Sequence, residues 1–271
     1  MSETPGTRAG GRILVDALRV HGVDRLFCVP GESYLDVLDA LYDTPEIAVI
    51  VAKHEGAAAN MAEADGKLTG RPGICFVTRG PGATHASVGV HTAYQDSTPL
   101  ILFIGQVQRN ARGREAFQEV EFRQMFAPTA KWVSEIETAD RIPEYVLRAF
   151  QVASSGRPGP VVLALPEDVL VERSAACDTA AFHAVQAAPG TEDLAAVRRE
   201  LERATQPLVI AGGSCWSDQG CAALAGFAQA NRLPVLTSFR RQDLIDNEHS
   251  CYAGHLSLGL PPHLQQRRKT P

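Results

Sequence analysis

The sequence predicts an α/β protein, with a doubly wound parallel six-stranded sheet followed by a smaller, partial α/β unit. Short and almost continuous apolar runs recur along the chain, as expected of parallel strands that are buried on both faces. Stretches with apolar residues at helical spacing lie between most of these runs. Such alternation of strands and helices is typical of a sheet that helices cover on both sides.

The elements of the first unit are expected in a regular order. A helix is predicted over residues 12–21, where apolar residues recur at helical spacing and Gly22 follows as a stop signal. Six strands are then predicted from the apolar runs, at residues 26–29, 47–52, 74–78, 100–104, 132–136 and 161–165. Amphipathic helices are expected between strands, including residues 34–42 and 140–154.

The same patterns predict where the domains begin and end. The expected parts are a disordered tail over 1–11, a first domain over 12–170, a linker over 171–190, a partial central domain over 191–260 and a polar tail over 261–271. The second unit is predicted to hold helices over 191–203 and up to Asn231, with strands at 208–211 and 235–238. Two strands and two helices bury too little surface to stand alone, so this unit is expected to be incomplete.

Composition excludes several classes of function. The 26 basic and 31 acidic residues give a net charge of -5, which lacks the basic footprint of a nucleic-acid-binding protein. No apolar run approaches the roughly 20 residues that cross a bilayer, and the first residues lack a signal-peptide pattern. The six cysteines have no spacing typical of a zinc site and suit a reducing compartment. We expect a cytoplasmic protein with no nucleic-acid partner, no membrane partner and no metal ligands.

Three turns at the carboxyl ends of predicted strands hold the candidate binding residues, because ligands of parallel α/β sheets lie at that edge. They are Pro-Gly-Glu-Ser at 30–33, Lys-His-Glu-Gly at 53–56 and Arg-Gly-Pro-Gly-Ala-Thr-His at 79–85. The third turn resembles a glycine-rich anion nest, but it lacks the ending of a P-loop, and His85 breaks the dinucleotide fingerprint. A tight turn without a ligand is the alternative for this motif taken alone.

Glu55 is the most informative of the candidate residues. A zincin motif around His54 is excluded because position 58 is Ala, and Ser214 is no nucleophile elbow because Trp216 replaces the required glycine. Glu55 instead lies between an apolar strand and a run of small residues, which lets a partner approach closely. A carboxylate placed there is largely desolvated and requires a hydrogen-bonding partner.

The three turns, in this order, resemble the pyrimidine-binding N-terminal domain of thiamine-diphosphate enzymes of the acetolactate synthase type. The resemblance covers about residues 12–170 densely. It also rests on Ala-Tyr-Gln-Asp-Ser-Thr-Pro-Leu at 93–100, Ile-Gly-Gln-Val at 104–107, Ala-Phe-Gln-Glu at 116–119 and Gly-Arg-Pro-Gly-Pro-Val at 156–161. Ile-Ala-Gly-Gly at 210–213 resembles the first half of the family's Rossmann-like central domain.

The resemblance implies thiamine diphosphate as cofactor and assigns roles to individual residues. Glu55 matches the catalytic glutamate that hydrogen-bonds to N1' of the aminopyrimidine and so promotes formation of the reactive ylid. The expected reaction is decarboxylation of a small 2-oxo acid such as pyruvate, followed by carbon–carbon ligation. The implied cofactor-binding residues are Pro30, Gly31, Glu55, Thr78, Pro81, His85 and Gln118. Phe117 and Lys131 match positions at the substrate entrance.

Departures from the family's pattern leave the substrate open. Glu32 replaces the usual glycine, and His85 replaces the usual asparagine. The Gly-Asp-Gly motif, which holds the diphosphate through Mg²⁺ in a C-terminal domain, does not occur in the 271 residues. The resemblance therefore implies a chain truncated by a frameshift, an early stop or a split gene, with Mg²⁺ expected from the missing domain. FAD is a further candidate cofactor.

These features favour the N-terminal portion of an acetolactate-synthase-like enzyme that is inactive alone. We expect a homodimer or homotetramer, or a partner chain that supplies the diphosphate domain. The alternative from another class is a non-catalytic binding or subunit-interaction module derived from such an enzyme. An NAD-type nucleotide-binding domain is disfavoured, because the fingerprint fails after the first strand.

Overall fold

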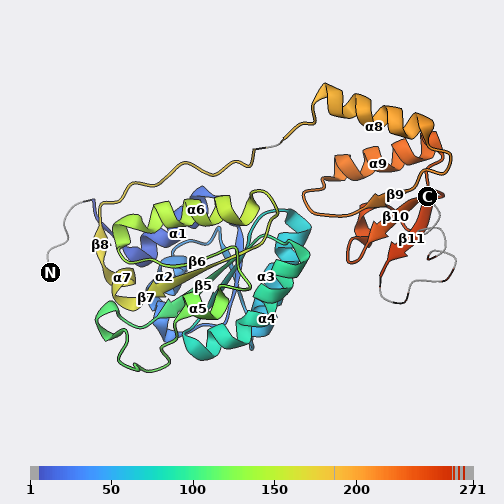
Figure 1. Ribbon diagram of the computed structural model, residues 1–271. Coiled ribbons are helices and arrows are strands. Elements are labelled where there is room, and N and C mark those ends of the chain that lie inside the picture. Colours follow the sequence, from blue (N-terminus) through green and yellow to red (C-terminus); the bar gives the residue numbers. More distant parts are fainter. Residues whose placement is uncertain (1–5, 186, 258, 260–261, 263–264, 266–271) are drawn as a thin grey trace. The chain divides into compact units, whose positions relative to one another are not determined.

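A computed structural model describes residues 6–185, 187–257, 259, 262 and 265 of the chain (Figure 1). It divides into two compact units, at residues 1–185 and 186–271. Residues 1–5 of the expected N-terminal tail, and most of the polar tail expected over 261–271, lie outside the described residues. In the described part of the chain, none of the helices is both long and apolar enough to span a membrane.

The first unit is built on a parallel sheet of six strands. These are β2 (Arg25–Cys28), β3 (Ala48–Val51), β4 (Gly73–Val77), β5 (Leu100–Gln106), β6 (Trp132–Glu135) and β7 (Pro160–Pro166). Their order in space is β3-β2-β4-β5-β7-β6. Every residue of β4, β5 and β7 is buried, as expected of central strands covered on both faces. The prediction of a doubly wound, six-stranded parallel sheet is confirmed.

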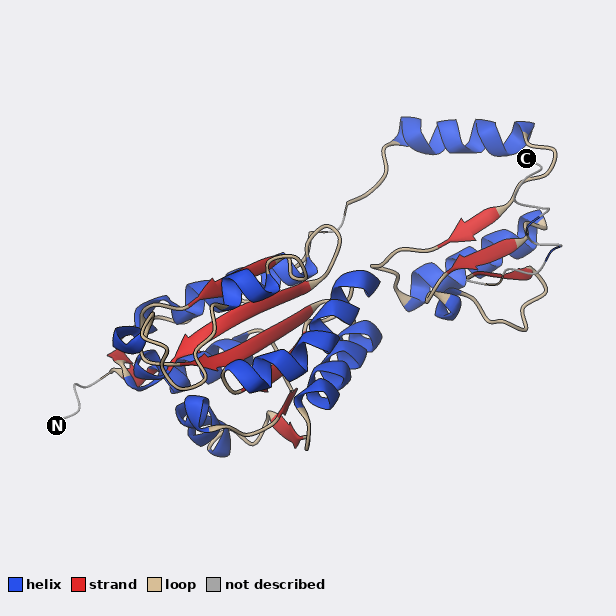
Figure 2. Cartoon of the chain, turned by 60° about the horizontal axis from the view of Figure 1, so that its bottom comes forward, coloured by secondary structure: helices blue, strands red, loops and turns tan. Residues whose placement is uncertain are grey.

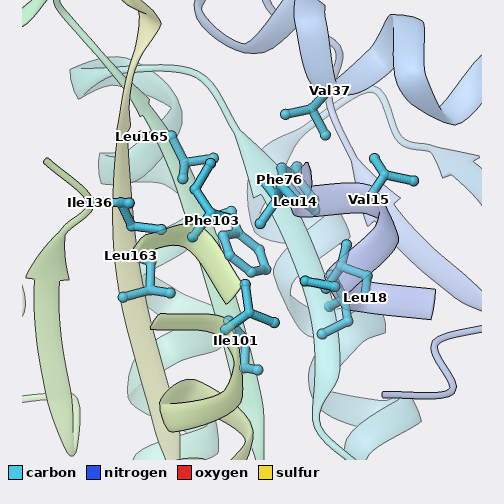
Figure 3. Close-up of a cluster of buried hydrophobic side chains, with 14 of the residues drawn as sticks. Leu14, Val15, Leu18, Val37, Phe76, Ile101, Phe103, Ile136, Leu163 and Leu165 are labelled. Atoms are coloured by element: carbon cyan, nitrogen blue, oxygen red, sulfur yellow. The ribbon is translucent and has the colours of Figure 1, made fainter. Parts of the chain in front are cut away.

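Helices cover both faces of this sheet (Figures 1 and 2). One face packs against α1 (Gly10–Val20), α2 (Leu35–Tyr42), α6 (Ile142–Ser154) and α7 (Glu167–Val171). The other packs against α3 (Glu55–Thr69), α4 (Gly80–Asp96) and α5 (Phe122–Phe126). Short 3-10 helices lie in the connections, at η1 (Glu32–Tyr34), η2 (Arg109–Ala111) and η3 (Ala139–Arg141). On the first face, Phe76 and Phe103 stack with ring centroids 4.6 Å apart at the centre of the core (Figure 3).

The first strand and the first helix include residues that the sequence analysis places in the tail. Arg8–Ala9 forms β1, which pairs antiparallel with β8 (Arg173–Ser174), and α1 begins at Gly10 rather than at residue 12. A Cβ atom on Gly10 would clash with the carbonyl oxygen of Val169. The glycine that suggests a loop in the sequence thus permits a close backbone approach. Residues 8–11, expected in the tail, and 173–174, expected in the linker, belong to the first unit.

The second unit contains a three-stranded parallel sheet. Its elements are α8 (Thr191–Arg203), β9 (Val209–Ala211), α9 (Asp218–Asn231), β10 (Val235–Ser238), η4 (Gln242–Leu244) and β11 (Tyr252–Leu256). The strand order is β11-β10-β9, so the expected two strands are corrected to three. The strand β11 has no clear sequence signal, because Gly254 and His255 interrupt its apolar pattern.

The helices α3 and α4 pack closely through small residues. A Cβ atom on Gly89 of α4 would lie 2.5 Å from the Cβ of Ala59 on α3 and 2.7 Å from its carbonyl carbon. Since real Cβ atoms do not approach backbone atoms this closely, position 89 requires glycine. The contact determines the separation of the two helices and of the turns from which they start.

Replacing Gly89 should therefore separate the helices and destabilise the first unit. We expect Gly89→Leu to lower the free energy of unfolding by about 1–3 kcal/mol, the usual cost of overpacking. The matched control is Val88→Leu, at an adjacent position that is 51% exposed, where the change should stay within about 0.5 kcal/mol. Urea denaturation followed by circular dichroism measures both. Equal stability of the two variants would contradict the close contact.

His21 makes the stability of the first unit depend on pH. Its Nδ1 donates to the carbonyl oxygen of Ala17 at 2.8 Å, and its ring stacks on Phe150 at a centroid distance of 4.3 Å. Burial lowers the pKa of His21, although the hydrogen bond to Ala17 acts in the opposite direction. The folded chain thus holds this imidazole neutral at pH values where the unfolded chain, with an ordinary histidine pKa of about 6.5, already binds a proton.

Stability is therefore expected to be complete above about pH 6.5 and to fall as the pH decreases below that value. Urea denaturation at pH 7.5 and 5.5 should show a larger loss for the parent chain than for His21→Gln, which does not titrate. Other groups contribute equally to both proteins, so the difference isolates His21. The same pH dependence in both proteins would refute the assignment.

Candidate functional site

The strand order changes direction between β2 and β4. The chain leaves β2 toward one face of the sheet and β4 toward the other, so the loops after these strands diverge at a topological switch point. Gly31, after β2, packs against Thr78, after β4; a Cβ atom on Gly31 would lie 2.6 Å from that of Thr78. The hydroxyl oxygens of Ser33 and Thr78 are 2.8 Å apart. Two of the three predicted turns therefore meet at this edge.

Glu55 is the first residue of α3, directly after the edge strand β3. His54 caps the helix, because its Nδ1 accepts a hydrogen bond from the backbone N–H of Gly56 at 3.0 Å. The carboxylate of Glu55 is 14% exposed, and its Oε2 lies 2.9 Å from Nδ1 of His85. Among the described residues its other oxygen, Oε1, has no hydrogen-bond partner. The partner that the sequence requires for Glu55 is thus supplied by α4.

Two titratable side chains whose pKa responds to the charge of Glu55, Cys75 and Tyr34, are held neutral. Burial raises the pKa of the Cys75 thiol, and the charges of Cys28 and Glu55 raise it further. Burial likewise raises the pKa of the Tyr34 hydroxyl, with smaller contributions from Cys28, Cys75 and Glu55. Both side chains therefore stay protonated at neutral pH and act neither as nucleophile nor as base.

His54, Glu55 and His85 form one cluster of potential metal ligands, whose ligand atoms lie within 4.8 Å of one another. These residues come from two helices, so no spacing in the sequence reveals the group, and the expectation that the chain has no metal ligands stays a prediction. The ligand atoms are spread more widely than the donors around zinc, which lie roughly 3.3 Å apart at bonds of 2.0–2.1 Å. Nδ1 of His54 accepts the N–H of Gly56, so only Nε2 of that ring is left for a metal. The cluster is arranged for hydrogen bonding.

Arg79 joins three loops at the carboxyl edge of the sheet. It precedes α4, is only 8% exposed, and pairs with Glu32 at 3.4 Å and with Glu167 at the start of α7. The loops after β2, β4 and β7 are thereby linked by one guanidinium group. Of the predicted cofactor-binding residues in these loops, Pro30 and Pro81 are exposed, and Pro81 lies in the first turn of α4.

A loop that carries Phe117 and Gln118 crosses the start of α4. The backbone N–H of Gly80 donates to the carbonyl oxygen of Gln118 at 3.0 Å. Gln118 has a φ of 64°, in the left-handed region that few residues other than glycine adopt. Phe117 is 72% exposed beside it. The structure thus brings these two predicted residues to the same helix end as Pro81 and His85.

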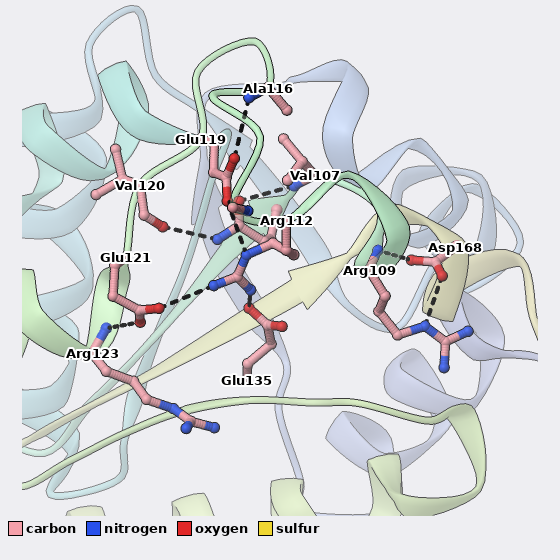
Figure 4. A network of polar contacts seen from close by, with 12 residues as sticks. Val107, Arg109, Arg112, Ala116, Glu119, Val120, Glu121, Arg123, Glu135 and Asp168 are labelled. Carbon is pink, nitrogen blue, oxygen red and sulfur yellow. Dashed lines mark hydrogen bonds and ion pairs between the residues drawn. The ribbon is translucent and has the colours of Figure 1, made fainter.

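Arg112 holds this loop in place (Figure 4). Its guanidinium pairs with Glu119 at 3.3 Å, with Glu121 at 3.1 Å and with Glu135 on β6. Glu119 also accepts hydrogen bonds from the backbone of Gly113 and Ala116, at 2.6 and 3.1 Å. These charge-assisted bonds fix the loop on both sides of Phe117 and Gln118. A local sequence signal for this role is absent, because the partners of Arg112 lie in two separate segments, at Glu119 and Glu121 and at Glu135.

Lys131 does not join the cluster. It precedes β6, and its backbone N–H donates to the carbonyl oxygen of Pro160 at the start of β7, at 2.8 Å. In a parallel sheet the residues before a strand and those after it lie at opposite edges. Lys131 is therefore at the edge remote from Glu55, where its ammonium group donates to the carbonyl oxygen of Ser155 at 2.8 Å. The assignment of Lys131 to a substrate entrance stays a prediction from the sequence, and within this chain Lys131 does not join Phe117.

Comparisons with known proteins agree with this architecture. Residues 8–125 match the N-terminal TPP binding domain of thiamine pyrophosphate enzymes, and residues 194–267 match the central domain of these enzymes. An acetolactate synthase large subunit of Parasynechococcus marenigrum is 34% identical over 95% of this chain and 43% of its own length. That of Haemophilus influenzae is 35% identical over 85% of this chain and 41% of its own length.

A probable acetolactate synthase large subunit of Methanocaldococcus jannaschii is 33% identical over 92% of this chain. The chain spans about two fifths of the length of these relatives. The two matched domains occur in sequence order and correspond to the two compact units of the structure. This chain belongs to the thiamine pyrophosphate enzyme family and is similar to acetolactate synthase large subunits.

Proposed function

We propose that this chain is the N-terminal portion of an acetolactate-synthase-like enzyme, which decarboxylates a 2-oxo acid such as pyruvate and ligates the product to an acceptor. The observation that carries the proposal is the carboxylate of Glu55. It is 14% exposed, has one oxygen held by His85, and has no partner for the other oxygen among the described residues. A desolvated carboxylate with a free oxygen is suited to bind a ring nitrogen that carries a proton.

These residues fit the pyrimidine end of thiamine diphosphate. Bound thiamine diphosphate supplies the carbanion chemistry that amino-acid side chains lack. Glu55 holds a proton at the N1' ring nitrogen, and its low exposure strengthens this hydrogen bond. The remaining proposed cofactor-binding residues are Pro30, Gly31, Thr78 and Gln118 in the connecting loops, and Pro81 and His85 near the start of α4. Phe117, exposed next to Gln118, is proposed to line the substrate entrance.

A second chain is proposed to complete the site. We propose that a partner in a homodimer or larger oligomer holds Mg²⁺ and the diphosphate, through the Gly-Asp-Gly motif that the resemblance to the family implies. The edge strand β3 supports such a contact, because Val49, Ile50 and Val51 are 37%, 37% and 59% exposed. An apolar strand edge left open to water is an association surface. FAD stays a sequence-based expectation.

Glu55→Gln should greatly slow activation of the cofactor, because an amide cannot take the proton that a carboxylate shares with N1'. The measurement is the exchange of the C2 proton of thiamine diphosphate, followed by NMR in a fusion of this chain to the rest of a relative's large subunit. We expect a loss of at least ~100-fold. Glu144→Gln, an exposed change on α6, serves as the control. Parent-like exchange by the Glu55 variant would disprove the assignment.

The 271-residue chain alone is expected to bind thiamine diphosphate weakly and to release no carbon dioxide from pyruvate. The pyrimidine end offers hydrogen bonds that contribute about 1 kcal/mol each, which does not offset the cost of immobilising a flexible cofactor. Isothermal titration with Mg²⁺ and an assay for carbon dioxide test this. Tight, magnesium-dependent binding with turnover would reveal a diphosphate site within these residues and contradict the proposal. Complete absence of pyrimidine binding by the folded chain would favour a non-catalytic interaction module.

A further inference from the structure

His85 contacts Glu55 through a chain of interactions that fixes its ring. The backbone N–H of Gly56 binds Nδ1 of His54, which holds the His54 ring at the start of α3. That ring stacks on His85, with centroids 4.7 Å apart and planes inclined by 28°. The Nδ1 of His85 then lies 2.9 Å from Oε2 of Glu55. A side chain that is itself 52% exposed is thus held in one orientation by its neighbours.

We propose that His85 is a positioning residue for Glu55, an inference that rests on the proposed function. Its Nδ1–H group holds Oε2, so that the carboxylate keeps one rotamer and leaves Oε1 available for the ring nitrogen of an aminopyrimidine. Long carboxylate side chains lose rotamer freedom when they bind a ligand, and prior fixation removes that cost. His85 therefore raises the affinity of the site for the pyrimidine without contacting its ring nitrogen.

The charges around the pair favour this arrangement. Glu55 lies at the first position of α3, where the helix dipole stabilises a carboxylate. The other titratable groups that face the pair are His54 on the same helix end, Cys75 on β4 and Tyr34 after β2. Cys75 and Tyr34 are protonated, and His54 uses its Nδ1 lone pair as the helix cap. Of these facing groups, His85 is the hydrogen-bond donor to the carboxylate.

The backbone holds the two helix starts at a fixed distance. A Cβ atom on Gly56 would lie 3.3 Å from the carbonyl oxygen of His85, so α3 and α4 are in contact at this level as well as at Gly89 and Ala59. The pair therefore does not depend on a flexible loop. Substitution of the half-exposed His85 side chain should leave the helix contact intact, because small residues and backbone atoms make that contact.

The first test is the tautomer of His85 in the chain itself. The hydrogen bond to Oε2 of Glu55 requires a proton on Nδ1 of His85, because the carboxylate oxygen can only accept. Long-range ¹H–¹⁵N NMR should show this tautomer for His85, and Glu55→Ala should convert it to the Nε2–H form. His91, exposed on the same helix, is the internal control and should not change. An Nε2–H tautomer in the parent, or no response to Glu55→Ala, overturns the proposal.

The second test is the affinity for 4-amino-5-hydroxymethyl-2-methylpyrimidine, which represents the pyrimidine end without the diphosphate. Chemical-shift titration should give binding that Glu55→Gln abolishes and His85→Ala weakens about fivefold, the equivalent of one hydrogen bond of about 1 kcal/mol. His85→Asn, which retains a side-chain donor, should restore most of the affinity. The amide spectra of the variants report whether each is folded.

The outcomes separate the two proposals. Parent-like binding by His85→Ala, with binding lost in Glu55→Gln, overturns the positioning role and leaves the proposed function standing. Tighter binding by His85→Ala also overturns it, because His85 would then compete with the pyrimidine for the carboxylate. If the parent binds no pyrimidine, the proposed function fails, and with it the role of His85 toward the cofactor; the tautomer measurement still decides whether His85 holds Glu55.

Discussion

The contact between α3 and α4 determines where the candidate site lies and which side chains form it. Gly89 and Ala59 bring the helices so close that even one added methyl group would meet backbone atoms at 2.7 Å. Both helices begin at the carboxyl edge of the sheet, α3 after β3 and α4 after β4. With the separation fixed there, Glu55 and His85, which are 30 residues apart in sequence, lie within hydrogen-bond distance. A wider helix pair would leave the carboxylate without its donor.

Two arginines hold the loops around this helix pair. Arg79 links the loops after β2, β4 and β7, and Arg112 fixes the loop that carries Phe117 and Gln118 (Figure 4). Loops at a sheet edge have few backbone hydrogen bonds of their own, so side-chain anchors determine their conformation. Charge-assisted, multidentate bonds from guanidinium groups are suited to this task. The residues expected around the cofactor are therefore held in place before any ligand binds.

The residues of the site supply only one part of the chemistry that the family performs. The turns at 30–33, 53–56 and 79–85 offer a carboxylate, histidines and close approaches that glycine permits. These suit an aromatic ring base that shares a proton with the carboxylate. Binding a diphosphate requires cations or a hard metal with oxygen ligands. The carboxylates on Arg79 and Arg112 already neutralise these two guanidinium groups, so neither offers a free positive charge. These residues suit the pyrimidine and not the diphosphate, so a second chain is proposed to complete the site.

The sequence by itself determined the six strands of the large sheet and helices such as α1, α2 and α6, because apolar periodicity is a local property that burial on one or two faces imposes. It also singled out Glu55, whose position after an apolar strand and before small residues is visible in one short segment. Tertiary structure alone decided the pairing of β1 with β8, the third strand β11, the remote position of Lys131 and the partnership of Glu55 with His85. Each of these features depends on a contact between two segments that are far apart in the sequence. The packing of helices against the sheet brings such segments together, and residue spacing does not reveal it.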